Sequence, residues 1–295
     1  MIKSLKSYFS RNAFTKFSNY LISLGYEEPK PRISIFPYLS GDAFLAMADV
    51  AIMHQASSPV VLRNRKDILF VEADLLEKPE VLDYSSKFQV VIGHNGDHEL
   101  SQSAIETMTG SGIKLFATNV KSKEPDVYTI PIGIENAHHR RNGSIHYFNP
   151  AHMSVLPLTK KQDLLVSFSV ATNPEVRSHL VSELQEAGFA NEKISISEYR
   201  SKLANARYVV SPPGNGIDCH RTWEAFYHKT VPVVEKQHWY FENHDLPVLV
   251  VDKFQDFIEL TEREKHGIYR DIIENKYYDA IYFDTGSGLF MKKLI

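Results

Sequence analysis

Cysteine is nearly missing from the 295-residue chain, which contains only Cys219. An intrachain disulfide is therefore excluded, and so is a zinc site built from several cysteines. Long apolar runs are missing as well. Residues 246–251 are among the longest, and they have the length of a strand rather than the roughly 20 residues that a membrane-spanning helix needs. The scarcity of cysteine predicts a protein of a reducing compartment.

A basic excess is also lacking. Lys and Arg total 33 against 36 Asp and Glu, which gives a net charge of −3 and an isoelectric point near 6.5. Proteins that bind nucleic-acid phosphates usually carry a positive surplus, so we do not expect a nucleic-acid partner. The composition is 43% hydrophobic and 12% aromatic, enough for a sizeable core, and the length predicts two domains.

The first 26 residues are basic and contain no acidic side chain before Glu27. Their apolar residues recur at roughly helical spacing, which predicts an amphipathic helix over residues 1–30 that packs on the first domain. The alternative for this segment is weak membrane association, because basic amphipathic helices also bind at membrane interfaces.

From residue 33 onward, short apolar runs alternate with helical patterns, which predicts parallel sheets with helical crossovers. We expect an α/β fold with two Rossmann-like domains, at 31–150 and 151–260, and a C-terminal helical segment over 261–295. The polar stretch over 136–161 is predicted to connect the two domains. The predicted strands are 33–39, 68–71, 88–92, 113–117, 127–132, 164–170, 193–196, 208–211, 231–234 and 246–251. The predicted helices are 42–55, 101–109, 174–187, 197–205, 218–229 and 254–275.

The densest chemical signal lies between residues 208 and 234, where a buried strand is stopped by consecutive prolines. A loop that tolerates positive φ and close ligand approach follows, and a helix begins near Asp218. The N-terminus of such a helix is a site for a diphosphate. Glu224 shares a helical face with the cations His220 and Arg221, and its carboxylate is placed to accept hydrogen bonds from ribose hydroxyls. The predicted binding residues here are Pro213, Gly214, Asn215, Gly216, Asp218, His220, Arg221 and Glu224.

This segment resembles the hallmark of the exostosin-type glycosyltransferases, in the bacterial and viral branch. The matching residues are Pro213, Gly214, Asn215, Gly216, Asp218, Arg221, Trp223, Glu224, Ala225, Pro232 and Val233. One departure is Lys229, where the family usually has glycine in the turn before the last strand. The likeness extends over most of the chain from Ser40 to Asp252.

The resemblance implies a GT-B arrangement, in which two Rossmann-like domains with parallel sheets face a cleft. It implies transfer of a sugar from a nucleotide-diphosphate donor, most commonly a UDP-sugar, to a glycan hydroxyl, with inversion. No obligatory cofactor or metal ion is implied. Two alternatives stay open: a GDP-sugar enzyme similar to the fucosyltransferases, or a non-catalytic nucleotide- or glycan-binding subunit of a glycan synthase. With one cysteine and no secretory-signal pattern, we expect a cytoplasmic enzyme, bacterial or virus-encoded.

Two further segments carry the same resemblance in the second domain. The loop after the strand at 164–170 is similar to the one that opens the donor half, which implies that Thr172, Asn173 and Arg177 face the diphosphate. Residues 197–199 resemble the segment on which the nucleobase edge rests, although Tyr199 also suits a core position.

The catalytic base is expected in the first domain, because an inverting transfer needs a group that takes the proton from the attacking hydroxyl. Strand-end loops offer Asp42, His94 and Asp97 as equal candidates, with Glu135 behind them. A zinc site at His94 and His98 is the competing interpretation of this region. Gly93 and Gly96 favour a loop over the helix that such spacing requires, so we expect no metal there.

Overall fold

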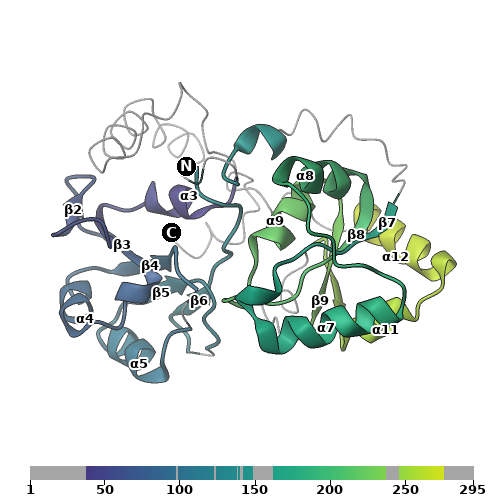
Figure 1. The fold of residues 1–295 in the computed structure, drawn as a ribbon. Helices are drawn as coiled ribbons and strands as arrows, with labels where there is room; N and C mark the ends of the chain where they lie inside the picture. Colours follow the sequence, from purple (N-terminus) through teal and green to yellow (C-terminus); the bar gives the residue numbers. More distant parts are fainter. Residues whose placement is uncertain are drawn as a thin grey trace. The chain divides into compact units, whose positions relative to one another are not determined.

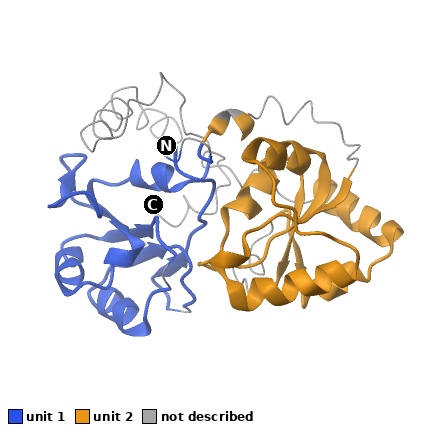
Figure 2. Cartoon of the chain, viewed as in Figure 1, with its two compact units in different colours: residues 1–143, 282–295 blue, residues 144–281 orange. Residues whose placement is uncertain are grey.

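The computed structural model describes residues 38–275 apart from 98, 123, 138, 140–141, 149–161 and 237–245. The chain divides into two compact units, residues 1–143 with 282–295, and residues 144–281 (Figure 2). The division after Gly143 falls inside the stretch 136–161 that the sequence predicts to be a connection. The predicted helix over residues 1–30 lies outside the described residues, as do most of the first predicted strand and the end of the segment 261–295.

Unit 1 is built on a six-stranded sheet with the order β2-β1-β3-β4-β5-β6 (Figure 1). Only β1 and β2 pair antiparallel, and the remaining neighbours are parallel. The strands are β1 (Val50–Ile52), β2 (Val60–Val61), β3 (Ile68–Glu72), β4 (Val90–His94), β5 (Lys114–Ala117) and β6 (Val127–Thr129). The helices are α3 (Gly41–Leu45), η1 (Ala73–Leu75), α4 (Pro79–Ser85) and α5 (Gln102–Gly110).

The two faces of this sheet follow from the alternation of side chains along each strand. Leu69, Val91 and Leu115 point to one face, where they form a buried core with residues of α4 and α5. The intervening Ile92 and Phe116 are equally buried and belong to the opposite face. The alternation therefore assigns His94, two residues beyond Ile92, to the face that carries α3.

The predicted helix over 42–55 is wrong beyond its first turn. Helix α3 ends at Leu45, and β1 (Val50–Ile52) follows after a short connection. Asp49 fixes this change, because its Oδ2 accepts the backbone N–H groups of Asp67 and Ile68 at 3.0 and 3.1 Å. The segment is thereby tied beside the start of β3, where Val50 and Ile52 suit a strand.

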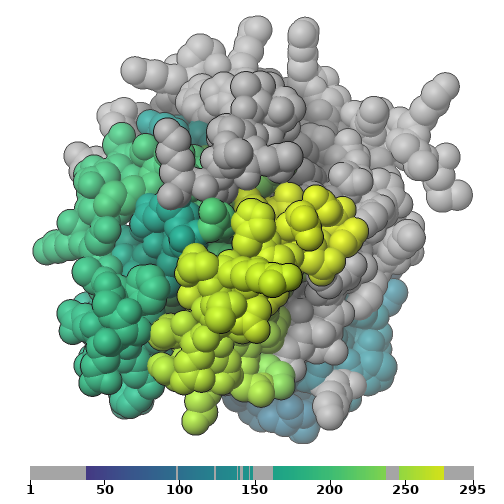
Figure 3. Space-filling view, turned by 90° about the vertical axis from the view of Figure 1, so that its right-hand side faces the viewer, coloured from purple at the N-terminus to yellow at the C-terminus, as the bar shows by residue number. Residues whose placement is uncertain are grey.

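Unit 2 is built on a four-stranded parallel sheet with the order β10-β9-β8-β7. Leu164, Tyr208 and Val231 face α7, α11 and α12, whereas Leu165 and Val209 face α8 and α9. Figure 3 shows α12, in yellow, on the surface of this unit. The strands are β7 (Gln162–Leu165), β8 (Ala206–Val210), β9 (Val231–Glu235) and β10 (Leu249–Val251). The helices are η2 (Ile145–Phe148), η3 (Val170–Thr172), α7 (Pro174–Glu186), α8 (Ile196–Asn205), α9 (His220–Tyr227), α11 (Phe254–Ile258) and α12 (Glu262–Asn275).

Several predictions for unit 2 are wrong in detail. The strand predicted over 164–170 ends at Leu165, and Val170 begins η3. Residues 193–196 form no strand; Ser195 instead caps α8, accepting the N–H of Glu198 with its side chain. The helix predicted over 254–275 is broken into α11 and α12. Thr261 causes the break, because its hydroxyl accepts from the N–H of Glu264 while the Glu264 carboxylate accepts from the N–H of Thr261. This reciprocal pair starts a new helix.

Both sheets, with helices on each face, are compatible with the Rossmann-like domains that the alternating pattern predicts. Within the described ranges, no helix combines the length and apolar character that crossing a membrane requires.

Candidate functional site

Arg177 joins the loop after β7 to the loop after β8, and so brings together two of the predicted binding segments. Its Nε donates to the carbonyl of Pro213 at 2.8 Å, and Nη2 donates to the carbonyl of Pro212 at 2.9 Å. Nη1 donates to Ser169 O at 2.7 Å and to the Thr172 hydroxyl, and Nη2 also reaches Cys219 Sγ at 3.8 Å. These contacts use all five guanidinium N–H groups.

Arg177 is also only 4% exposed, and its contacts give it a positioning role. The expectation from the resemblance was a direct contact with the diphosphate. In this structure its donors point to the protein's own carbonyls, so the residue fixes the shape of the loop over which a diphosphate would bind. The lack of a side chain at Gly214 is part of this clamp, because a Cβ there would lie 3.1 Å from Arg177 Nη2. Positive φ plays no part, since Gly214 and Gly216 are not among the residues with that conformation.

Asn173 secures the same junction from the other side. Its Oδ1 accepts the N–H of Val176 at the start of α7, and its Nδ2 donates to Gly214 O at 3.1 Å. The Gly214 N–H in turn donates to Gly216 O at 2.9 Å, which closes the turn. The predicted residues Thr172, Asn173 and Arg177 therefore do lie beside the Pro213–Gly214 loop, as two strand-end loops of one sheet should.

Helix α9 begins at His220 rather than near Asp218, and the side chain of its N-cap residue, Cys219, makes no capping hydrogen bond. Asp218 serves the fold: its Oδ1 accepts the N–H of Cys219 at 2.8 Å, and both carboxylate oxygens lie 2.9 Å from Nε1 of the buried Trp223. This arrangement holds the loop against the helix. The positive dipole end at the start of α9 favours an anion.

Glu224 lies one turn into α9 and is 7% exposed. Burial raises the pKa of its carboxyl, while the positive charges of His220, Arg221 and Arg200 oppose that rise. Arg200 comes from α8 and is 6% exposed. A buried carboxylate surrounded by three potential cations is an arrangement typical of binding sites.

Tyr199, Arg200, His220, Arg221 and Glu224 form the Glu224 cluster. The Tyr199 hydroxyl and Nε of Arg221 are among its buried polar atoms that make no hydrogen bond of standard geometry within the described residues. Tyr199 is 9% exposed, and its pKa is raised by burial and then by the negative charge of Glu224, while Arg221 lowers it. Hydrogen-bonding contacts with Glu224 and Arg221 also shift the pKa of Tyr199, so the three polar groups face one another, but these contacts lack the geometry of a full hydrogen bond. Buried donors that the protein leaves unsatisfied cost stability, and a ligand with oxygen acceptors would satisfy them.

Lys229 occupies the position in the turn before β9 where the exostosin-type pattern has glycine. Its φ is +51°, in the left-handed region that glycine adopts without strain. The turn before β9 has the geometry for which the family's glycine is suited, and this chain adopts it with lysine.

In unit 1, Asp42 is the best-placed of the predicted bases. It is 3% exposed, and its Oδ2 accepts the N–H of Ala137 at 2.7 Å, with no donor to Oδ1 among the described residues. Burial raises the pKa of the Asp42 carboxyl to about 6, the Ala137 N–H lowers it, and the charge of Glu135 raises it further. A carboxyl with a pKa near 6 is matched to accept a proton close to neutral pH.

A chain of hydrogen bonds connects Asp42 with His94. Asn136 accepts the backbone N–H of Asp42 at 2.9 Å and donates to Asn95 Oδ1 at 2.9 Å. The backbone N–H of Asn95 donates to His94 Nδ1 at 2.7 Å. A Cβ at Gly41 would overlap Asn95 Oδ1, so the network depends on the missing side chain there.

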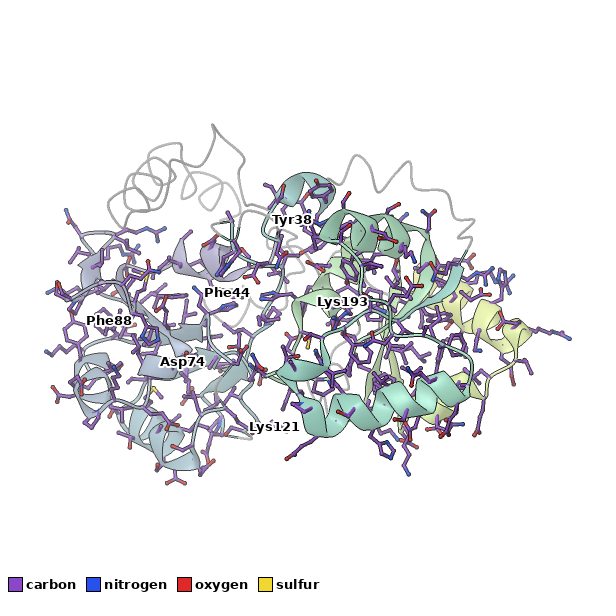
Figure 4. The ribbon with its side chains drawn as sticks, viewed as in Figure 1. Tyr38, Phe44, Asp74, Phe88, Lys121 and Lys193 are labelled. Carbon is purple, nitrogen blue, oxygen red and sulfur yellow. The ribbon has the colours of Figure 1, made fainter. Side chains whose placement is uncertain are left out.

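His94 belongs to the end of β4, not to the loop after it, and it is 1% exposed. With Nδ1 accepting from Asn95, Nε2 carries the proton and donates to the carbonyl of Pro131 at 3.1 Å. The imidazole also packs against the ring of Phe44 in α3, with 5.1 Å between the ring centroids and 30° between the ring planes. The side chain of Phe44 is labelled in Figure 4. Both ring nitrogens are thus engaged, which favours a positioning role over that of a base.

The remaining candidates of unit 1 differ in their surroundings. Asp97 is exposed. The charge of Glu135 acts on the Asp42 carboxyl, and Oε1 of Glu135 lies 3.7 Å from Nε2 of His139. His98 lies outside the described residues. No group of three or more His, Cys, Asp and Glu side chains suited to a metal ion exists among the residues searched, which are the described ones.

Sequence reasoning missed one buried polar residue of unit 1 and two residues at the Glu224 cluster. Thr118 follows β5 and is 1% exposed, and its hydroxyl has no partner within the described chain. Arg200 belongs to the Glu224 cluster, and it lies over the adjoining Tyr147 ring at 3.9 Å. Arg200 directly follows Tyr199 in the sequence, but a single arginine in a polar helix forms no motif by which its role could be predicted.

No protein-family model matches the chain, and no curated protein sequence shows significant similarity to it. A functional proposal therefore has to come from the chemistry of the two clusters.

Proposed function

We propose that this protein is an inverting glycosyltransferase that takes a sugar from a nucleoside-diphosphate donor, with a UDP-sugar as the first choice, and transfers it to a glycan hydroxyl. In this proposal the two units are the acceptor and donor halves of a GT-B enzyme. The observation that supports it most is the buried Glu224 cluster, in which a carboxylate lies among three potential cations, one turn from the start of α9, beside a tyrosine hydroxyl and an arginine nitrogen that lack a hydrogen bond of standard geometry.

The parts of the nucleotide donor would be bound by helix α9, and the loop before that helix would be held in shape by Arg177 and Asn173. The start of α9 and the guanidinium of Arg221 match the two negative charges of a diphosphate, and they would stabilise the charge that grows on it as the sugar leaves. The carboxylate of Glu224 is an acceptor for the ribose hydroxyls, next to the Tyr199 hydroxyl. Arg177 and Asn173 would hold the loop in its binding shape without touching the ligand.

Acceptor activation is assigned to Asp42. Its carboxylate would take the proton from the glycan hydroxyl as that oxygen attacks the anomeric carbon from the face opposite the diphosphate. The bond between the anomeric carbon and the diphosphate oxygen breaks in the same step, which inverts the configuration. Asn136, Asn95 and His94 would position Asp42.

The test is a nucleotide-release assay with a panel of UDP-sugars and GDP-sugars and a mixture of glycan acceptors. We expect UDP release that depends on acceptor, with Asp42→Asn reducing turnover at least a hundredfold while UDP affinity stays within twofold. The matched control is Asp83→Asn, because Asp83 is an exposed carboxylate on α4. Nucleotide release from GDP-sugars alone would contradict the UDP-sugar assignment and favour the alternative of a GDP-sugar enzyme. Binding without any release would support the alternative of a non-catalytic subunit.

A further inference from the structure

Tyr147 is an exposed aromatic side chain on the turn η2 (Ile145–Phe148). It is 47% exposed, and Val61 is the other large hydrophobic side chain counted as exposed within the described residues. The turn η2 that carries Tyr147 is anchored by its neighbour Phe148, which is 1% exposed and packs against the rings of Tyr227 and His228 at 5.7 and 5.6 Å. The exposed ring is therefore held on a fixed base at the end of α9.

Arg200 connects this ring to the Glu224 cluster. The centre of its guanidinium lies 3.9 Å from the centroid of the Tyr147 ring, a distance at which the two planes are in contact. The same arginine is 6% exposed and contributes to the positive charge around Glu224. Tyr147, Arg200 and Glu224 thus form one continuous group within unit 2.

We propose that Tyr147 is the stacking platform for the nucleobase of the donor, with Arg200 fixing the ring from its other face. This inference rests on the proposed function, because it takes Glu224 as the ribose site and places the base next to it. An aromatic face backed by a cation suits a nucleobase, since every base presents a π-face and stacking needs no hydrogen-bond pattern.

The experiment measures binding by calorimetry with two probes, UDP and inorganic pyrophosphate, which share the diphosphate but not the base. We expect Tyr147→Ala to weaken UDP binding about tenfold and to leave pyrophosphate binding within twofold. Tyr147→Phe keeps the ring and should bind UDP within twofold of the unchanged protein. Val61→Ala is the matched control, because it removes the other exposed large hydrophobic side chain, in unit 1, and should change neither affinity. Thermal unfolding of each variant checks that the fold is kept.

The outcomes separate the two proposals. Equal losses of UDP and pyrophosphate in Tyr147→Ala, or no loss of either, would overturn the stacking role while the nucleotide site itself stands. If the unchanged protein binds no nucleoside diphosphate, the proposed function fails and the stacking platform fails with it.

Discussion

Replacing Asp42 by asparagine should stabilise unit 1 at neutral pH while removing its proposed chemistry. The Asp42 carboxyl has an ordinary pKa of 3.8 and one of about 6 in the folded chain, chiefly because it is buried. Since the folded pKa lies above the unfolded one, the folded state binds the proton more tightly, and stability falls as pH rises between the two values. Each pKa unit corresponds to 1.36 kcal/mol, so the charged carboxylate costs up to about 3 kcal/mol above pH 6.

The amide of asparagine has nearly the shape of the carboxylate and can accept the same N–H from Ala137. We therefore expect Asp42→Asn to raise the free energy of unfolding by about 2–3 kcal/mol at pH 8 and by almost nothing at pH 3.5. Urea titrations followed by circular dichroism measure this. Both tryptophans, Trp223 and Trp239, fall within residues 144–281, so their fluorescence follows unit 2 as an internal control. A stability loss at pH 8, or a gain independent of pH, would refute the reasoning from burial.

Other substitutions test particular contacts. Lys229→Gly should stabilise unit 2 by about 0.5–1 kcal/mol, because it relieves left-handed strain, whereas Lys229→Ala should not; urea midpoints decide. Arg177→Ala should lower the free energy of unfolding by about 2–4 kcal/mol through loss of the loop clamp, and an unchanged urea midpoint would contradict that role. Arg221→Ala should instead weaken UDP binding by about 1.5–3 kcal/mol at nearly constant stability, as titration would show. Gly41→Ala should disrupt the Asn95 network and lower turnover; full activity would separate that network from catalysis.

Much of the strand and helix pattern could be predicted from periodicity alone. The apolar runs at 68–71, 113–117 and 231–234 became β3, β5 and β9, and the helix predicted over 174–187 is α7 within one residue. The failures arise where a single polar side chain overrides the pattern. Asp49 ties residues 49–52 beside β3, and the pair of Thr261 and Glu264 divides a helix that periodicity alone would continue.

The candidate site was predictable in its location but not in the roles of its members. The prolines, glycines and cations around residue 213 mark a strand-end loop, and the structure brings Thr172, Asn173 and Arg177 to that loop. Tertiary contacts decide how an arginine is used: the donors of Arg177 are taken up by the protein's own groups, whereas Nε of Arg221 has no hydrogen bond within the described residues. The pKa of Asp42 likewise depends on burial, which no local motif encodes.

The central claim is that unit 2 binds a nucleoside diphosphate through the Glu224 cluster. Calorimetric titration of the full chain with UDP, GDP and CMP, each with and without EDTA, tests it most directly, with Glu224→Gln measured beside the unchanged protein. The account predicts micromolar binding of UDP that EDTA does not alter and that Glu224→Gln weakens at least fivefold. Absence of binding to all three nucleotides, or UDP binding that is indifferent to Glu224→Gln, would contradict it.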